Sequence, residues 1–444
     1  MTTDEFEFGL DTPAFVTVDE AGQPLSGDVV IRNTIEEAVL ADAVGIDSFN
    51  IGEHYRPDLM DSAGHVMLAA IAGRTERISL GTAVTVLSTQ DPVRVYTDFA
   101  TLDAVSNGRA QLIVGRGSLT ESFPLFGFDL ADYETLFEEK LDLLTRLLRD
   151  QPVTWSGTVR SSLTDQVLSP PLPAGHLPTW VGVGGSPQSV VRAARYGLPP
   201  MLAVIGGPPA RFAPHIELYE RALEEYGHPA LPIGMHSPGY VASTDVEAAD
   251  IQWPYWAEAL EGASRERGWA RPTMNQFQDE IAGGSLYVGS PETVATKLAA
   301  AIRLLGLSRF DMAYATGRVP HEQRMATIEL YGREVIPRVR ELLEDPAAQP
   351  SPSDQRPAER SPHPNLVSSG AAPFSQRSVP TPGISGRSSA VTQPGERSLT
   401  AGTAFSARSP VARQPAAAAS RPLPSVKRKA VSCVMDGVPS ISTR

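Results

Sequence analysis

The chain is short of cysteine, and its one cysteine, Cys433, lies near the end of its 444 residues. A single cysteine excludes a disulfide framework and a zinc site built from thiolates. No apolar run approaches the roughly 18 residues of a membrane-spanning helix. The opening residues, MTTDEFEFGLDT, lack the basic and apolar regions of a secretory signal. We therefore expect a cytoplasmic protein with no membrane segment.

Positive charge is also scarce over most of the chain. The formal net charge is −13, but residues 347–444 hold 12 Lys and Arg against 4 Asp and Glu. This segment therefore carries +8, which leaves residues 1–346 at −21. An acidic body of this kind disfavours nucleic acid as the main partner.

The segment 347–444 differs from the body in composition as well as in charge. It holds 14 prolines and 18 serines, few large apolar residues and no regular hydrophobic period. Such a segment cannot bury enough apolar surface to offset its chain entropy, so we expect it to be disordered. Its basic cluster Lys427-Arg428-Lys429 is either solvated, the interpretation that we favour, or a patch for an anionic surface. We expect residues 1–346 to form one domain.

Strands alternate with helices along the body. The predicted strands are 6–10, 48–52, 78–87, 110–114, 179–183, 201–205, 233–241 and 310–314. The predicted helices are 31–43, 65–73, 92–105, 137–148, 187–196, 212–226, one that follows Thr244-Asp245, 291–305 and 321–343, and residues 155–168 resemble an inserted hairpin. About eight strands separated by helices predict an α/β fold, a (β/α)₈ TIM barrel with insertions.

Active sites of such barrels lie where the strands end. Four predicted strands that are neighbours in the barrel end in polar or glycine-rich segments: 52–55 (Gly-Glu-His-Tyr), 85–88 (Thr-Val-Leu-Ser), 115–118 (Gly-Arg-Gly-Ser) and 184–186 (Gly-Gly-Ser). We therefore expect the functional site on this part of the rim.

Two of these segments contain the elements of a phosphate site. Gly184, Gly185 and Ser186 precede a helix, whose first turn contains Ser189, and they offer backbone N–H groups and hydroxyls to an anion. Arg116 lies between two glycines and could reach a phosphate with its guanidinium group. The alternative is a tight turn capped by Ser186, with Arg116 in a structural ion pair.

His54 is the candidate proton carrier, because it follows a strand and titrates near neutral pH. The alternatives are a structural histidine and a metal ligand, but the chain has no HxH or HExxH pattern, so we expect no metal site. His236, at the end of another strand, is a weaker candidate. Neither a GxSxG nucleophile elbow nor a phosphate-binding P-loop motif is present.

Several stretches resemble the bacterial luciferase-like monooxygenase family. The longest runs from Gly81 to Arg109 and contains LDAVSNGR. Shorter matches are Glu53-His54, LIVGRGS at 112–118, SFPLFG at 122–127, TWVGVGGS at 179–186, AARYG at 193–197 and GSPETV at 289–294. The resemblance covers about residues 5–343.

This resemblance implies a TIM barrel that binds reduced FMN at its mouth, with the deazaflavin F420 as the alternative cofactor. Arg116, Ser186 and Ser189, with the turn Gly184-Gly185, would hold the phosphate. Ala83, Val84 and Thr85 would pass against the flavin ring, on a strand that carries a non-proline cis peptide in many members. His54 would act near the flavin.

The implied reaction is the oxygenation of a small organic substrate by O₂, with electrons from NAD(P)H, directly or through a separate reductase. The resemblance also implies a homodimer. Luciferases have a second histidine where Tyr55 stands and a reactive cysteine where Gly115 stands, so light emission is not expected. The alternative functions are a dehydrogenase that uses F420 or FMN without oxygen chemistry, a non-enzymatic flavin-binding protein and a hydrolase. The sequence does not identify the substrate.

Overall fold

The computed structural model describes residues 6–19, 21–117, 119–149, 151–173, 176–267, 271–314 and 316–344. The segment 347–444, which we expect to be disordered, lies outside the described residues. Among those that are described, no helix is both long and apolar enough to cross a membrane.

Eight parallel strands close into a barrel. In their order around the barrel they are β1 (Glu7–Thr12), β2 (Ser48–Ile51), β3 (Ser79–Val86), β4 (Leu112–Gly115), β7 (Thr179–Val183), β8 (Pro200–Ala203), β9 (Gly234–Val241) and β11 (Arg309–Tyr314). Pairing of β11 with β1 completes the ring. The predicted TIM barrel is therefore confirmed.

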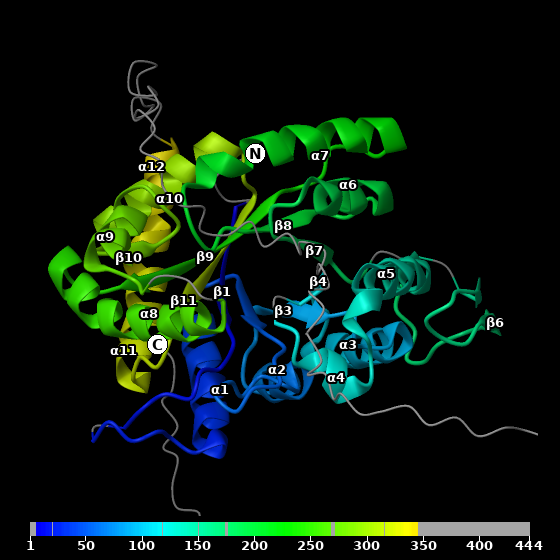
Figure 1. Cartoon of the computed structure of the whole chain (residues 1–444), viewed down its shortest axis with the longest axis horizontal. Helices are drawn as coiled ribbons and strands as arrows, with labels where there is room; N and C mark the ends of the chain where they lie inside the picture. Colours follow the sequence, from blue (N-terminus) through cyan, green and yellow to red (C-terminus); the bar gives the residue numbers. More distant parts are fainter. Residues whose placement is uncertain are drawn as a thin grey trace, which may run out of the picture. The chain divides into compact units, whose positions relative to one another are not determined.

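Helices surround the strands in chain order (Figure 1). They are α1 (Gly27–Ala43), α2 (Gly64–Ala72), α3 (Pro92–Ser106), α5 (Tyr133–Arg149), α6 (Pro187–Tyr196), α7 (Ala213–Tyr226), α10 (Pro291–Leu305) and α11 (His321–Leu330). Local signals set several of their ends. For example, the side chain of Asp91 accepts the Val93 N–H at the start of α3, and Asn107 ends that helix at φ 60°.

Additional elements interrupt the repeat. The predicted hairpin is present as β5 (Val153–Trp155) and β6 (Leu163–Gln166). The predicted ranges did not include α4 (Ser122–Phe126), α9 (Met274–Ala282) or the short β10 (Tyr287–Gly289), whereas α8 (Asp245–Arg267) begins after Thr244 as expected. Short 3₁₀ turns are at Leu130–Asp132 and Pro209–Phe212.

The last predicted helix, 321–343, is not continuous. A π-helical turn at Tyr331–Val335 separates α11 from α12 (Ile336–Glu344). Within this turn Gly332 packs so closely on Val44 that a Cβ atom would lie 2.4 Å from a Val44 methyl carbon. This contact with the end of α1 is a tertiary feature, so helical periodicity could not have predicted it.

A buried polar cluster fills the barrel near the N-terminal ends of its strands. Arg309 donates to Asp311 (2.8 and 2.9 Å), to Ser48 (3.2 Å) and to Gln111. Asn50 donates to Asp311 (3.2 Å) and accepts from Gln111 (3.1 Å). We call Arg309, Asp311, Ser48, Asn50 and Gln111 the barrel plug. Because the plug is fully buried, it restricts any ligand in the barrel to the end where the strands terminate.

Candidate functional site

The four predicted rim segments lie side by side, because β2, β3, β4 and β7 are consecutive in the barrel. Glu53 connects the first two of them. Its carboxylate accepts the backbone N–H of Val86 at 2.8 Å and the Gln90 amide at 2.7 Å. The Tyr55 hydroxyl donates to the same carboxylate at 2.8 Å. Glu53 therefore fixes the turn that follows β3.

His54 is held by a carboxylate that the sequence analysis missed. Its ring Nδ1 lies 2.7 Å from Asp61 Oδ2, and its backbone N–H donates to Asp61 Oδ1 at 3.1 Å. The Asp61 side chain is fully buried, while 21% of the His54 side chain is exposed. Nε2 is thus the ring nitrogen left for a ligand.

The environment of this pair favours the protonated ring. Burial opposes protonation of His54, but the hydrogen bond and the negative charge of Asp61 outweigh it, so the pKa of His54 is raised. Burial also raises the pKa of the Asp61 carboxyl. The pair can therefore hold a proton at the rim and release it at a higher pH than an ordinary histidine.

The strand expected to face a flavin ring has a non-proline cis peptide between Ala83 and Val84. Both side chains are half-buried and pack on Ile113, Trp180 and other residues inside the barrel. Thr85 differs from them, because it is buried and its hydroxyl lies 2.8 Å from that of Thr82. Only Ala83 and Val84 of the three predicted residues therefore present partly exposed side chains.

Two glycines let the Val84 side chain pack closely on the neighbouring strands. A Cβ atom on Gly115 would lie 2.6 Å from a Val84 methyl carbon, and one on Gly182 would lie 3.1 Å from the other. A side chain at position 115 would therefore collide with Val84.

The turn between β7 and α6 has the form of an anion site. Gly185 has φ +100°, a conformation that favours glycine, and Gly184 is exposed. Ser186 stands at the N-cap of α6 without a side-chain bond to the helix. Its hydroxyl instead contacts that of the buried Ser189 at 3.2 Å. His215 supports the turn from α7, with Nε2 2.7 Å from the Gly185 carbonyl oxygen.

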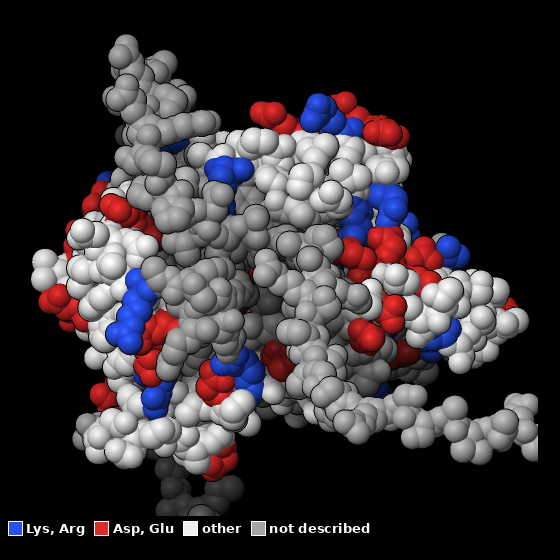
Figure 2. Space-filling view, in the orientation of Figure 1, with Lys and Arg blue, Asp and Glu red and all other residues white. Residues whose placement is uncertain are grey.

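Arg116 lies in an ion pair, as the structural alternative proposed. It contacts Glu134, whose side chain is 57% exposed and whose other oxygen binds Arg192 of α6 at 2.7 Å. Basic and acidic side chains meet between α5 and α6 in Figure 2. Because Glu134 is exposed, its place beside Arg116 is open to exchange with another anion. Ser118, next in this segment, lies outside the described residues.

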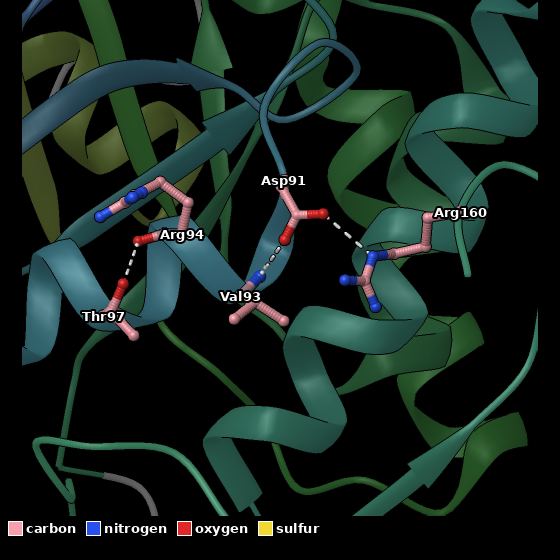
Figure 3. Close-up of a pocket in the computed structure, with 5 residues that line it drawn as sticks. All are labelled: Asp91, Val93, Arg94, Thr97 and Arg160. Atoms are coloured by element: carbon pink, nitrogen blue, oxygen red, sulfur yellow. Dashed lines mark hydrogen bonds and ion pairs between the residues drawn. The ribbon is translucent and has the colours of Figure 1, made fainter. Parts of the chain in front are cut away.

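A separate pocket lies outside the barrel, at the start of α3 (Figure 3). Its lining residues are Asp91, Val93, Arg94, Thr97 and Arg160. Asp91 already accepts from Val93 N–H and from Arg160, both at 2.9 Å, so its charge is satisfied. Among the described residues, no group of three or more His, Cys, Asp or Glu side chains is placed to bind a metal.

A protein-family model matches most of the chain. The family model for luciferase-like monooxygenases matches residues 7–309. The chain is 35% identical over 170 residues to 4-hydroxyprotoasukamycin monooxygenase of Streptomyces nodosus, with 38% of this chain and 46% of that protein covered. It is 26% identical over 240 residues to the alkanal monooxygenase alpha chain of Photorhabdus laumondii, covering 50% and 62%. It thus spans about half the length of the curated relatives that it matches.

Solved structures agree on the fold. Monooxygenase RslO1 from Streptomyces bottropensis superposes with a TM-score of 0.65 at 25% identity, covering 74% of this chain and 99% of that one. Two more distant structures share the fold alone, each with a TM-score of 0.59. One is the oxygenating constituent of 3,6-diketocamphane monooxygenase from Pseudomonas putida with FMN (21% identity, 75% and 98% covered), and the other is an F420-dependent secondary alcohol dehydrogenase with an F420-acetone adduct (19%, 76% and 99%). The chain belongs to the luciferase-like monooxygenase family.

Proposed function

We propose that this protein is a flavin-dependent monooxygenase that uses reduced FMN and O₂ to oxygenate a small organic substrate. The observation that carries the proposal is the shared rim of four consecutive strands. His54 follows β2, Ala83 and Val84 lie in β3, Arg116 follows β4 and α6 begins after β7. Membership of the family supports the reaction class.

The residues at this rim fit a flavin phosphate and ring. Gly115 and Gly182 let the Val84 side chain lie directly against β4 and β7, because a Cβ atom on either glycine would lie within 3.1 Å of a Val84 methyl carbon. The N-terminus of α6 and the Ser186 hydroxyl suit a phosphate. Arg116 would exchange Glu134 for that phosphate, a stronger partner for its guanidinium group. We assign these groups, with Gly184, Gly185 and Ser189, to phosphate binding, and Ala83, Val84 and Thr85 to the strand beneath the ring.

A bound reduced flavin supplies the electrons that activate O₂. The protein's own residues position the reactants and manage protons. Asp61 orients the His54 ring so that Nε2 can give or take a proton at the rim. Glu53 holds the turn after β3 by accepting the Val86 N–H. The buried barrel plug closes the barrel at the N-terminal ends of its strands and so keeps water from reaching the site through that end.

The electrons come from NAD(P)H, directly or through a separate reductase. In this proposal the active form is a homodimer in the cytoplasm and residues 1–346 form the flavin-binding domain. Use of F420 without oxygen chemistry is the second candidate, favoured by the shared fold of the F420-dependent alcohol dehydrogenase.

Cofactor identification tests the proposal. The purified full chain is titrated with FMN and with F420, and the bound species is identified by absorbance and mass. We expect saturable FMN binding, and oxygen consumption coupled to product formation from a panel of aldehydes, ketones and phenols. Hydride transfer to or from F420 without oxygen uptake would replace the monooxygenase with the dehydrogenase. Tight FMN retention without turnover would indicate a flavin-binding protein.

A further inference from the structure

A second imidazole–carboxylate pair joins β9 to β1. The Nδ1 atom of His236 in β9 is hydrogen-bonded to the carboxylate of Asp11 in β1. The Asp11 side chain is 5% exposed and the His236 side chain is 22% exposed. These values nearly match those of the His54–Asp61 pair.

Strand register places both side chains inside the barrel. His236 is the register partner of Asp311, a plug residue, and residues paired across parallel strands point to the same face. Asp11 follows two residues after Gly9, and a Cβ atom on Gly9 would lie 2.2 Å from Asp311 Oδ1. Asp11 is therefore also on the inner face, one layer closer to the mouth.

The plug does not need this pair. Arg309, Asn50 and Gln111 satisfy Asp311 and one another without any bond to His236 or Asp11. Small residues surround the pair on neighbouring strands, with Ala203 of β8 in register with His236 and Ala313 of β11 in register with Asp11. Among the described residues, Nε2 of His236 has no hydrogen-bond partner. The pair thus leaves Nε2 of a partly exposed ring without a partner in this part of the chain.

The charges around His236 favour its protonated form. Burial opposes protonation, but the charge and hydrogen bond of Asp11 outweigh it and raise the pKa of His236, with a smaller contribution from Asp311. Arg309 is the cation facing the same group of carboxylates, and it acts on Asp11. Burial raises the pKa of Asp11 itself. In the protonated ring both nitrogens donate, Nδ1 to Asp11 and Nε2 to a group outside the pair.

We propose that His236 binds the organic substrate, and that Nε2 donates a hydrogen bond to a carbonyl oxygen or to an anionic enolate or phenolate oxygen. Asp11 is the positioning residue that holds the ring. This inference rests on the proposed flavin function, with the flavin phosphate held by the β4 and β7 half of the rim and the substrate oxygen by the β9 and β1 half. It assigns the class of substrate as one with an oxygen that accepts a hydrogen bond.

Binding of a phenolate probe tests the assignment without turnover. The full chain, with and without saturating FMN, is titrated calorimetrically with 4-nitrophenolate and with nitrobenzene, which has the same nitro-substituted ring without the phenolate oxygen. We expect the wild type to prefer the phenolate, and His236→Gln to reduce that preference by about 10-fold to 100-fold, as for loss of a charged hydrogen bond. An unchanged preference in His236→Gln, or none in the wild type, would overturn the inference.

Two further variants and an FMN titration separate loss of a substrate contact at His236 from a general effect of breaking a histidine–carboxylate pair. Asp11→Asn, which keeps the volume but removes the charge, should reduce the preference less than His236→Gln does. His321→Gln is the matched control, because His321 also binds a buried carboxylate, Glu37, at 2.9 Å, but on the helices outside the barrel. It should leave probe binding unchanged. FMN titration of the same samples tests the proposed function separately, since failure to bind FMN would contradict that function and not the probe result.

Discussion

His54–Asp61 and His236–Asp11 form the same bond in different settings. In both pairs a buried aspartate holds Nδ1 of a ring that is about one-fifth exposed. The first pair is local, with its members seven positions apart, and it lies in the loop after β2. The second joins residues 225 positions apart on two strands of the barrel wall.

Because of this difference, we expect the two pairs to have different roles. The loop pair stands beside Glu53, which holds the turn after β3, so His54 lies at the rim where the reactants would meet. The strand pair is anchored on two strands of the barrel wall, and sites built on strands hold their geometry more precisely than sites on loops, which suits recognition of a fixed oxygen position. We therefore expect changes at His54 to affect the chemical step and changes at His236 to affect substrate binding.

The largest effect should come from His54→Gln. Loss of a proton-transfer group lowers kcat by about 100-fold to 10,000-fold. FMN affinity should change by less than about threefold, since His54 is not assigned to the phosphate. Steady-state kinetics with the best substrate of the panel, beside FMN titration, measures both. Equal loss of kcat in His54→Gln and His236→Gln would end the distinction between the two pairs.

The next largest effect concerns FMN affinity, which depends on the proposed phosphate site after β4 and β7. Arg116→Ala should weaken FMN binding by about 2–4 kcal/mol, because it removes a charged partner of the phosphate. Glu134→Ala is the matched control, since it breaks the same ion pair but leaves Arg116 free. It should bind FMN as tightly as the wild type or more tightly. If both variants lose stability and neither loses FMN affinity, Arg116 has only a structural role.

A smaller effect is expected in the pH dependence of stability. The pKa of His236 is raised on folding, so its contribution to stability is complete below about pH 6.5 and is lost as the pH rises through the folded value. The free energy of unfolding of wild type minus that of His236→Gln should therefore shrink as the pH rises, as measured by urea titration at several pH values. A difference that grows with pH would contradict a raised pKa of His236 in the folded protein.

The smallest effect should follow removal of residues 347–444. If residues 1–346 form the flavin-binding domain, truncation after residue 346 should change the free energy of unfolding by less than about 0.5 kcal/mol. FMN affinity and both histidine phenotypes should be preserved. A large loss of FMN binding in the truncated chain would place part of the site in the tail.

Local signals explain how much of the fold was predictable. The bounds of α6 and α10 agree with the predicted ranges, because proline follows a serine at the start of each and glycine ends each at positive φ. β10 was missed because three residues have no readable period, and α9 because its short segment follows a long helix. The π-helical turn depends on a contact between residues far apart in the sequence.

The site was predictable only where its residues are close in the chain or at recognised strand ends. His54 and the rim segments followed from the ends of predicted strands. Asp61 was missed because nothing in the sequence shows that it is buried beside His54. Asp11 directly follows the predicted strand 6–10, so the same strand-end rule could have identified it. The plug could not be foreseen, since Arg309 and Gln111 are 198 residues apart.

A crystal structure of the full chain with FMN tests the central claim most directly. We predict the phosphate at the start of α6, within hydrogen-bonding distance of Arg116 and Ser186, with the ring beside Val84 and both His54 and His236 facing the remaining space. A phosphate bound away from Arg116 and Ser186, or a ring that covers His236 and leaves no room for a substrate, would contradict it.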